Sequence, residues 1–170
     1  MRQRMVVGVN GSPSSLAALH RATAEARERH AELHVVLAWQ LPGGGLGGRA
    51  TYGATALHEC REAAVENLRT ILDSAFAVRR PGVTLSGLVV RGEPGAVLVE
   101  AARSCDDLLV VGTGPRGSWL PRMRPSVTRY CVAHATCPVL AVPPNPLEAE
   151  LAAIHRATRL LRPLPGGQER

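Results

Sequence analysis

The stretch that decides the fold is MVVGVNGSP, residues 5–13. Residues 5–9 are a short apolar run, which predicts a buried strand. The Asn-Gly-Ser-Pro that follows predicts a turn, in which Ser12 is a suitable helix N-cap and Pro13 suits the first helical turn. Apolar residues then recur at helical spacing as far as residue 26. A buried strand that runs directly into a helix is the first unit of an α/β fold.

The same alternation continues along the chain. Apolar runs predict further strands at residues 33–39, 83–90, 108–111 and 138–142, and helical patterns fall at residues 55–78, 94–101 and 127–135. Such an alternation predicts an α/β domain with a parallel, doubly wound sheet, which we assign to residues 1–143. Residues 144–170 form a C-terminal extension with the spacing of an amphipathic helix, which either packs back on the domain or meets a partner.

The composition is that of an ordinary globular protein. Of the 170 residues, 45% are hydrophobic and 20% are charged, a balance that does not suggest disorder. No apolar run approaches the roughly 18 residues of a membrane span. The N-terminal MRQR leads into the first strand without a cleavage-site pattern, so we expect a cytoplasmic protein with no membrane association. Four cysteines without a CxxC pair are expected to be reduced and buried.

The net charge of +6 invites a nucleic-acid hypothesis, but the residue types do not favour it. All twenty basic residues are arginine, and aromatic residues make up only 3% of the chain. The chain therefore has no aromatic platform on which bases could stack, and we expect no nucleic-acid partner. The absence of lysine also excludes a Walker A motif and Schiff-base chemistry.

Two turn-rich loops follow strands and mark the candidate ligand site, namely residues 10–13 and 112–118. Ligands of open α/β sheets bind beyond the carboxyl ends of strands, where the strand order reverses. If the first and fourth strands are neighbours, both loops border one crevice. The second loop also contains GxGxxG, but Pro121 and Pro125 interrupt the segment where a Rossmann helix should begin, so a dinucleotide site is disfavoured.

Other candidate sites are weaker. Cys131, His134 and Cys137 are spaced three apart, but no fourth ligand is evident, so we expect no structural zinc. Asp106 and Asp107 precede the fourth strand, and we interpret them as a solvated strand entrance rather than as paired catalytic carboxylates. No nucleophile elbow or catalytic triad order is present.

The order of these parts resembles the universal stress protein family over about residues 3–143. The resemblance rests on five stretches, VVGVNGSPSS (6–15), ELHVVLAW (32–39), RGEPGAVLVEAA (91–102), DDLLVVGTGPRG (106–117) and PSVTRYCVAHATCPVLAVP (125–143). It implies a five-stranded parallel sheet in the order 3-2-1-4-5 with helices on both faces. It also implies ATP or a related adenine nucleotide in the crevice, and a homodimer through the fifth strand, Pro138 to Val142.

The family's phosphate-binding signature, Gly-x2-Gly-x9-Gly followed by Ser or Thr, is only partly kept. Gly112 and Ser126 stand at its ends at the correct distance, whereas Pro115 and Pro125 replace its other glycines. Proline has no N–H to donate. If both lost donors served phosphates, about 3–6 kcal/mol of binding free energy is missing. Asn10 stands where the family carries an acidic residue, so the oxygen acceptor is kept and the charge is lost.

The resemblance implies two groups of binding residues in this chain. On the adenine and ribose side they are Gly8, Asn10 and Ala38, and toward the phosphates they are Gly112, Arg116, Ser126 and Val127. Val111, which precedes the loop, is a further expected binding residue. Arg116, Arg122 and Arg124 either replace the lost backbone donors or are solvated surface residues. Ser126 is also expected to cap the helix that follows.

These observations predict a non-catalytic, adenine-nucleotide-binding stress-response protein with a weakened phosphate loop. The alternative is a nucleotide-free interaction module that acts through its dimer surface or its C-terminal helix. A weak ATPase ranks behind both, because Asn10 provides no acidic metal ligand and no base is placed to activate water.

Overall fold

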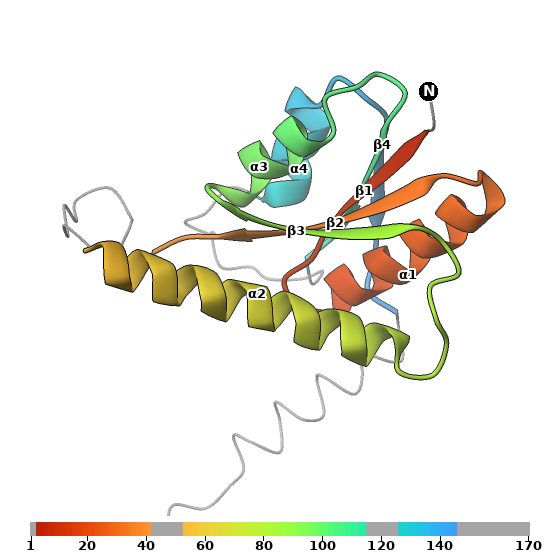
Figure 1. The fold of residues 1–170 in the computed structure, drawn as a ribbon. Coiled ribbons are helices and arrows are strands. Elements are labelled where there is room, and N and C mark those ends of the chain that lie inside the picture. The colour runs from red at the N-terminus through yellow and green to blue at the C-terminus, as the bar shows by residue number, and fades with distance from the viewer. Residues whose placement is uncertain (1–2, 42–52, 115–125, 146–170) are drawn as a thin grey trace, which may run out of the picture.

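Five parallel strands form one sheet in the order β3-β2-β1-β4-β5 (Figure 1). The computed structural model describes residues 3–41, 53–114 and 126–145. The described elements follow one another as β1 (Arg4–Gly8), α1 (Pro13–Glu28), β2 (Glu32–Trp39), α2 (Ala54–Phe76), β3 (Leu85–Arg91), α3 (Pro94–Ala101), β4 (Leu108–Gly112), α4 (Val127–His134) and β5 (Val139–Val142). The predicted α/β class and the strand order 3-2-1-4-5 are confirmed, and the element ends differ from prediction by one or two residues.

Helices cover both faces of the sheet, with α1 and α2 on one face and α3 and α4 on the other (Figure 1). Successive side chains of each central strand point to opposite faces of the pleated sheet. In β1, Met5 and Val7 belong to the core beneath α1 and α2, whereas Val6 belongs to the core beneath α3 and α4. The three central strands are therefore buried on both sides, which explains why they are almost continuous apolar runs.

The strand order reverses between β1 and β4. β1 pairs in parallel with β2 on one side and with β4 on the other, and Met5 is in register with Leu108. The chain leaves β1 through α1 toward β2 and leaves β4 through α4 toward β5. Their helices therefore lie on opposite faces, and the carboxyl ends of β1 and β4 form the switch point at which such sheets bind ligands.

A partly buried ion pair joins the amino ends of β1 and β4. The Arg4 guanidinium donates from Nε and Nη2 to the two Asp107 carboxylate oxygens, at 3.0 and 2.7 Å. The Asp107 side chain is only 2% exposed, so the prediction of a solvated strand entrance is wrong for this residue. The Ser104 amide also donates to it. The hydrogen bonding to Asp107 raises the pKa of Arg4. Together with the Ser104 amide it stabilises the buried carboxylate.

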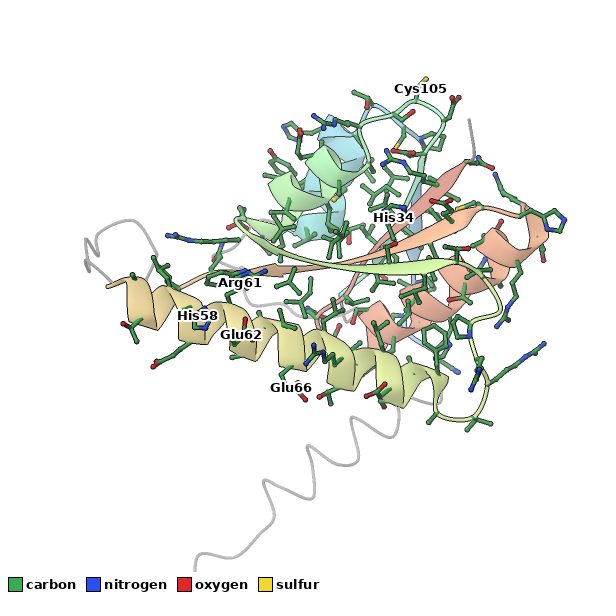
Figure 2. The ribbon with its side chains drawn as sticks, in the orientation of Figure 1. His34, His58, Arg61, Glu62, Glu66 and Cys105 are labelled. Atoms are coloured by element: carbon green, nitrogen blue, oxygen red, sulfur yellow. The ribbon has the colours of Figure 1, made fainter. Side chains whose placement is uncertain are left out.

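Many charged residues of the described chain lie on the exposed surface of α2. α2 buries only three of its side chains and carries charges of both signs outward, among them Glu62 and Glu66 (Figure 2). Arg61 and Arg69 lie 3.4 Å from these carboxylates. Such exposed pairs contribute little to stability.

The described helices include none that is both long and apolar enough to cross a membrane. All four cysteines are free. Cys131 and Cys137 are buried as expected, but Cys105 is exposed (Figure 2) and Cys60 is half-buried, so the expectation of four buried thiols is wrong. Cys105 lies in the short connection between α3 and β4.

Candidate functional site

A cavity of about 360 Å³ lies at the switch point, beyond the carboxyl ends of β1, β2 and β4. Three parts of the structure line it. β1 and the start of α1 supply Gly8, Val9, Asn10, Ser12, Ser14 and Ser15. β2 and α3 supply Val36, Ala38, Pro94 and Leu98. β4, its exit and the start of α4 supply Val111, Gly112, Gly114, Ser126, Val127 and Thr128.

The structure brings together seven of the eight residues singled out from the sequence. Those seven line the one cavity and are Gly8, Asn10, Ala38, Val111, Gly112, Ser126 and Val127. Arg116 lies outside the described residues, as do Pro115 and Pro125. Sequences far apart in the chain therefore meet at one place, as the two-loop hypothesis requires.

The β1–α1 junction, residues 9–15, is closed by its own hydrogen bonds. The Asn10 side-chain oxygen accepts a hydrogen bond from the Ser12 amide at 3.1 Å. The Ser15 hydroxyl lies 3.3 Å from the Asn10 amide, which donates to it, and it donates to the Ser12 carbonyl at 2.9 Å. Ser12 accepts from the Ser15 amide at 3.3 Å, which confirms Ser12 as the N-cap of α1.

Gly112 is required where β4 meets the start of α1. A Cβ atom added to Gly112 would lie 2.4 Å from the Ser14 carbonyl oxygen and 2.9 Å from the Ser15 nitrogen. Both are backbone atoms, so the contact has no side chain that could move aside. At Gly8 the added atom would instead meet the Leu98 side chain at 2.6 Å. The glycine that opens the second loop therefore has a packing role independent of any ligand.

The β4–α4 junction is less tightly bonded in its described residues, 112–114 and 126–128. Ser126 occupies the N-cap position of α4, as predicted, but its side chain makes no capping hydrogen bond. Thr128 donates from its hydroxyl to the Gly112 carbonyl at 3.0 Å, which ties the start of α4 to the end of β4. Thr113 continues the β4–β5 ladder by donating its amide to the Val142 carbonyl at 2.8 Å.

The described wall of the cavity has no charged side chain, but one part of it is polar and another is apolar. None of its lining side chains is ionisable. Hydroxyl groups gather where α1 and α4 begin, and the amino ends of helices carry partial positive charge, which favours anions. The β2 and α3 side is apolar, with Val36, Ala38 and Leu98. The arrangement suits a ligand with an apolar ring at one end and an anionic or hydroxyl-bearing group at the other.

Charged groups and thiols lie near the cavity but not on its wall. Glu93 is exposed and accepts a hydrogen bond from the Gln40 side chain. Burial raises the pKa of the Cys131 thiol to about 11, so it is neither a nucleophile nor a ready metal ligand at neutral pH. Among the described residues no three His, Cys, Asp or Glu side chains are placed to hold a metal ion.

The sequence did not single out the whole wall. Ser14 and Ser15 closely follow the predicted cap Ser12, and Thr128 closely follows the predicted cap Ser126. The sequence therefore already indicated that their hydroxyls lie near the same helix ends. Pro94 and Leu98 had no such signal, because α3 reaches the cavity through its packing against α4, β1 and β2.

Comparisons with known proteins agree with this fold. The chain matches the Universal stress protein family over residues 1–143. It is similar to a universal stress protein solved in complex with cAMP, with 30% identity over 85% of this chain and 98% of that one, and a TM-score of 0.61. A universal stress protein family member from Burkholderia pseudomallei is 27% identical over 84% of this chain and 96% of that one, with a TM-score of 0.58.

A more distant structure shows the fold alone. Universal stress protein UspA from Lactobacillus plantarum is 21% identical over 84% of this chain and 99% of its own, with a TM-score of 0.61. No curated protein matches the chain.

Proposed function

The chain belongs to the universal stress protein family, and from that premise and its cavity we propose that it binds an adenine nucleotide in the stress response without converting it chemically. The observation that carries this proposal is the meeting of seven expected residues around one cavity at the sheet's switch point. The similar protein solved with cAMP supports the same ligand class.

The polar and apolar sides of the cavity support one orientation of the nucleotide. Val36, Ala38 and Leu98 form the apolar side, which suits the adenine ring. Asn10 and Gly8 line the cavity at the carboxyl end of β1, and we propose them as the ribose contacts. Ser126 and Val127 begin α4, whose amide groups and partial positive charge suit a phosphate. Val111 and Gly112 line the cavity at the end of β4, and Arg116 is proposed as a further phosphate contact from the loop.

The described lining residues support a binding rather than a catalytic role. Hydrolysis of a phosphoanhydride needs a group that positions or deprotonates water and groups that neutralise the developing charge. The described wall contains hydroxyls, an amide and apolar groups only. None of these is a general base at neutral pH.

Calorimetric titration with ATP, ADP, AMP and cAMP tests the proposal. Ala38→Phe fills the apolar side of the cavity and is expected to weaken binding tenfold or more, because the ring displaces the adenine. Ala133→Phe, on the exposed surface of α4, is the matched control and should bind as the native protein does. The proposal fails if none of the four nucleotides binds at millimolar concentration. Mass spectrometry of nucleotide that copurifies with the protein would identify the ligand.

The weakened phosphate loop is part of the proposal. Pro115 and Pro125 cannot donate backbone hydrogen bonds to phosphates. The double substitution Pro115→Gly and Pro125→Gly is therefore expected to strengthen ATP binding by about 100-fold or more, from the roughly 3–6 kcal/mol estimated for two charged hydrogen bonds. Unchanged affinity in that variant would show that these positions do not serve the phosphates.

A homodimer through β5 is proposed on the family relation. β5 lies at the edge of the described sheet and pairs there with β4 alone. Ala141 is exposed on that strand. Ala141→Asp is expected to shift the protein toward monomer in light-scattering measurements, with Ala133→Asp as the exposed control. An equal mass for both variants and the native protein would contradict the β5 interface.

The two prolines also support a second candidate, a nucleotide-free interaction module. In that case ATP has no effect on partner or oligomer behaviour, and deletion of residues 147–170 changes it. The extension lies outside the described residues apart from its first two, Pro144 and Asn145. Comparison of the full chain with the deletion variant, each with and without ATP, separates the two functions.

A further inference from the structure

The carboxyl end of β1 provides an amide where a magnesium site needs a carboxylate. Mg²⁺ bound with a nucleotide is usually held by one or two protein carboxylates together with the phosphates. Asn10 is the polar side chain that ends β1 at the cavity. Its side-chain oxygen accepts a hydrogen bond from the Ser12 amide at 3.1 Å. This oxygen therefore already stabilises the turn that leads into α1.

The segments on either side of the cavity contain no acidic residue at all. Residues 1–24 and residues 108–147 include both strand exits, and neither segment has an Asp or a Glu. Residues 108–147 carry four arginines instead. No stretch that continues from these walls can therefore supply the missing carboxylate.

The carboxylates that directly precede α3 and β4 in the chain are engaged elsewhere. Glu93 precedes Pro94 of the wall, but it is exposed and accepts a hydrogen bond from Gln40. Asp107 precedes β4 at its opposite end, about 16 Å from Gly112 for a strand of this length. It is also held by two hydrogen bonds from Arg4.

The cavity has another source of positive potential. The first residues of α1 and of α4 both line it, and each helix start carries about half a positive charge. Two such ends balance about one negative charge. That matches the charge of a cyclic phosphate and offsets half or more of the charge of a monophosphate, which is about −1.5 to −2 at pH 7. A triphosphate carries more charge and normally brings a cation with it.

We infer that this cavity takes a mono- or cyclic nucleotide without a divalent cation, and that Asn10 is the residue that sets this specificity. The inference rests on the proposed nucleotide-binding function.

Titrations of AMP, cAMP and ATP, each with excess Mg²⁺ and with EDTA, test the inference. The affinities for AMP and cAMP are expected to change less than twofold between the two conditions, and Mg²⁺ is expected not to strengthen ATP binding. A gain of tenfold or more for ATP with Mg²⁺ overturns the inference and leaves nucleotide binding intact. Failure of every nucleotide in both conditions overturns the proposed function and this inference with it.

Asn10→Asp tests the assigned residue directly. An aspartate keeps the oxygen that accepts from the Ser12 amide and adds the charge that a cation needs. This variant is expected to bind ATP at least fivefold more tightly with Mg²⁺ than with EDTA. Gln3→Glu makes the same change of charge at the opposite end of β1 and should show no metal effect. An equally metal-independent Asn10→Asp variant would overturn the assignment of Asn10.

Discussion

The two strand-to-helix junctions that border the cavity differ in how firmly they are held. β1 runs into α1, whose sixteen residues include eight buried ones and whose cap, Ser12, bonds to the helix. β4 runs into α4, whose eight residues include one buried side chain, Cys131, and whose Ser126 side chain makes no capping bond. One wall of the cavity is thus anchored in the core, and the other depends on fewer contacts. Ligand contacts at α4 are therefore expected to add more order than contacts at α1.

Gly112→Ala should have the largest effect, because it acts where the two junctions touch. The added methyl group would meet the Ser14 backbone at 2.4 Å, so β4 and α1 must separate. We expect a loss of about 3 kcal/mol of unfolding free energy. Gly8→Ala meets only the Leu98 side chain and should lose about 1 kcal/mol. Urea denaturation measures both, and similar losses would show that the Gly112 contact can relax.

Alkaline pH should lower the free energy of unfolding, because Cys131 is the buried side chain of α4 at the β4–α4 junction. Burial raises the pKa of Cys131 from 9.0 to about 11, so the folded protein holds this proton more tightly than the unfolded chain does. The stabilisation is present below pH 9 and is lost as the pH rises from about 9 to about 11. Thermal denaturation across that range should show a falling free energy of unfolding.

The control for this effect is Cys131→Ala. Because burial also raises the pKa of Cys137, the slope should become smaller without disappearing. A native-like slope in Cys131→Ala would assign the alkaline loss to other groups. Thiol labelling at pH 8 should modify the exposed Cys105 first and Cys131 last.

The two serines at the N-cap positions should give the smallest effects. Ser12→Ala should cost more stability, and Ser126→Ala should cost more nucleotide affinity. Ser12→Ala removes a cap hydrogen bond and should cost about 1 kcal/mol of unfolding free energy. Ser126→Ala removes a hydroxyl that makes no capping bond and should cost a few tenths of a kcal/mol. If Ser126 contacts the phosphate, its substitution should weaken nucleotide binding about fivefold or more. Equal stability losses would contradict the difference between the junctions.

Much of the fold and part of the site followed from local patterns. The apolar runs predicted the strands, and the turn-rich exits after residues 9 and 111 predicted which strand ends would carry the ligand site. Asp107 was misjudged because its partner Arg4 is 103 residues away in sequence. Cys105 was misjudged because a cysteine between polar residues gives no periodic signal of exposure.

By itself the sequence determined the alternation of strands and helices, the cap at Ser12, and the absence of acidic residues from residues 1–24 and 108–147. These are properties of neighbouring residues, which backbone geometry and hydrogen bonding settle locally. Only the tertiary structure decided that Leu98 and Pro94 complete the cavity, that Gly112 must approach the Ser14 backbone, and that Asn10 turns its oxygen toward Ser12. Those facts depend on packing between segments far apart in the chain, which no local pattern encodes.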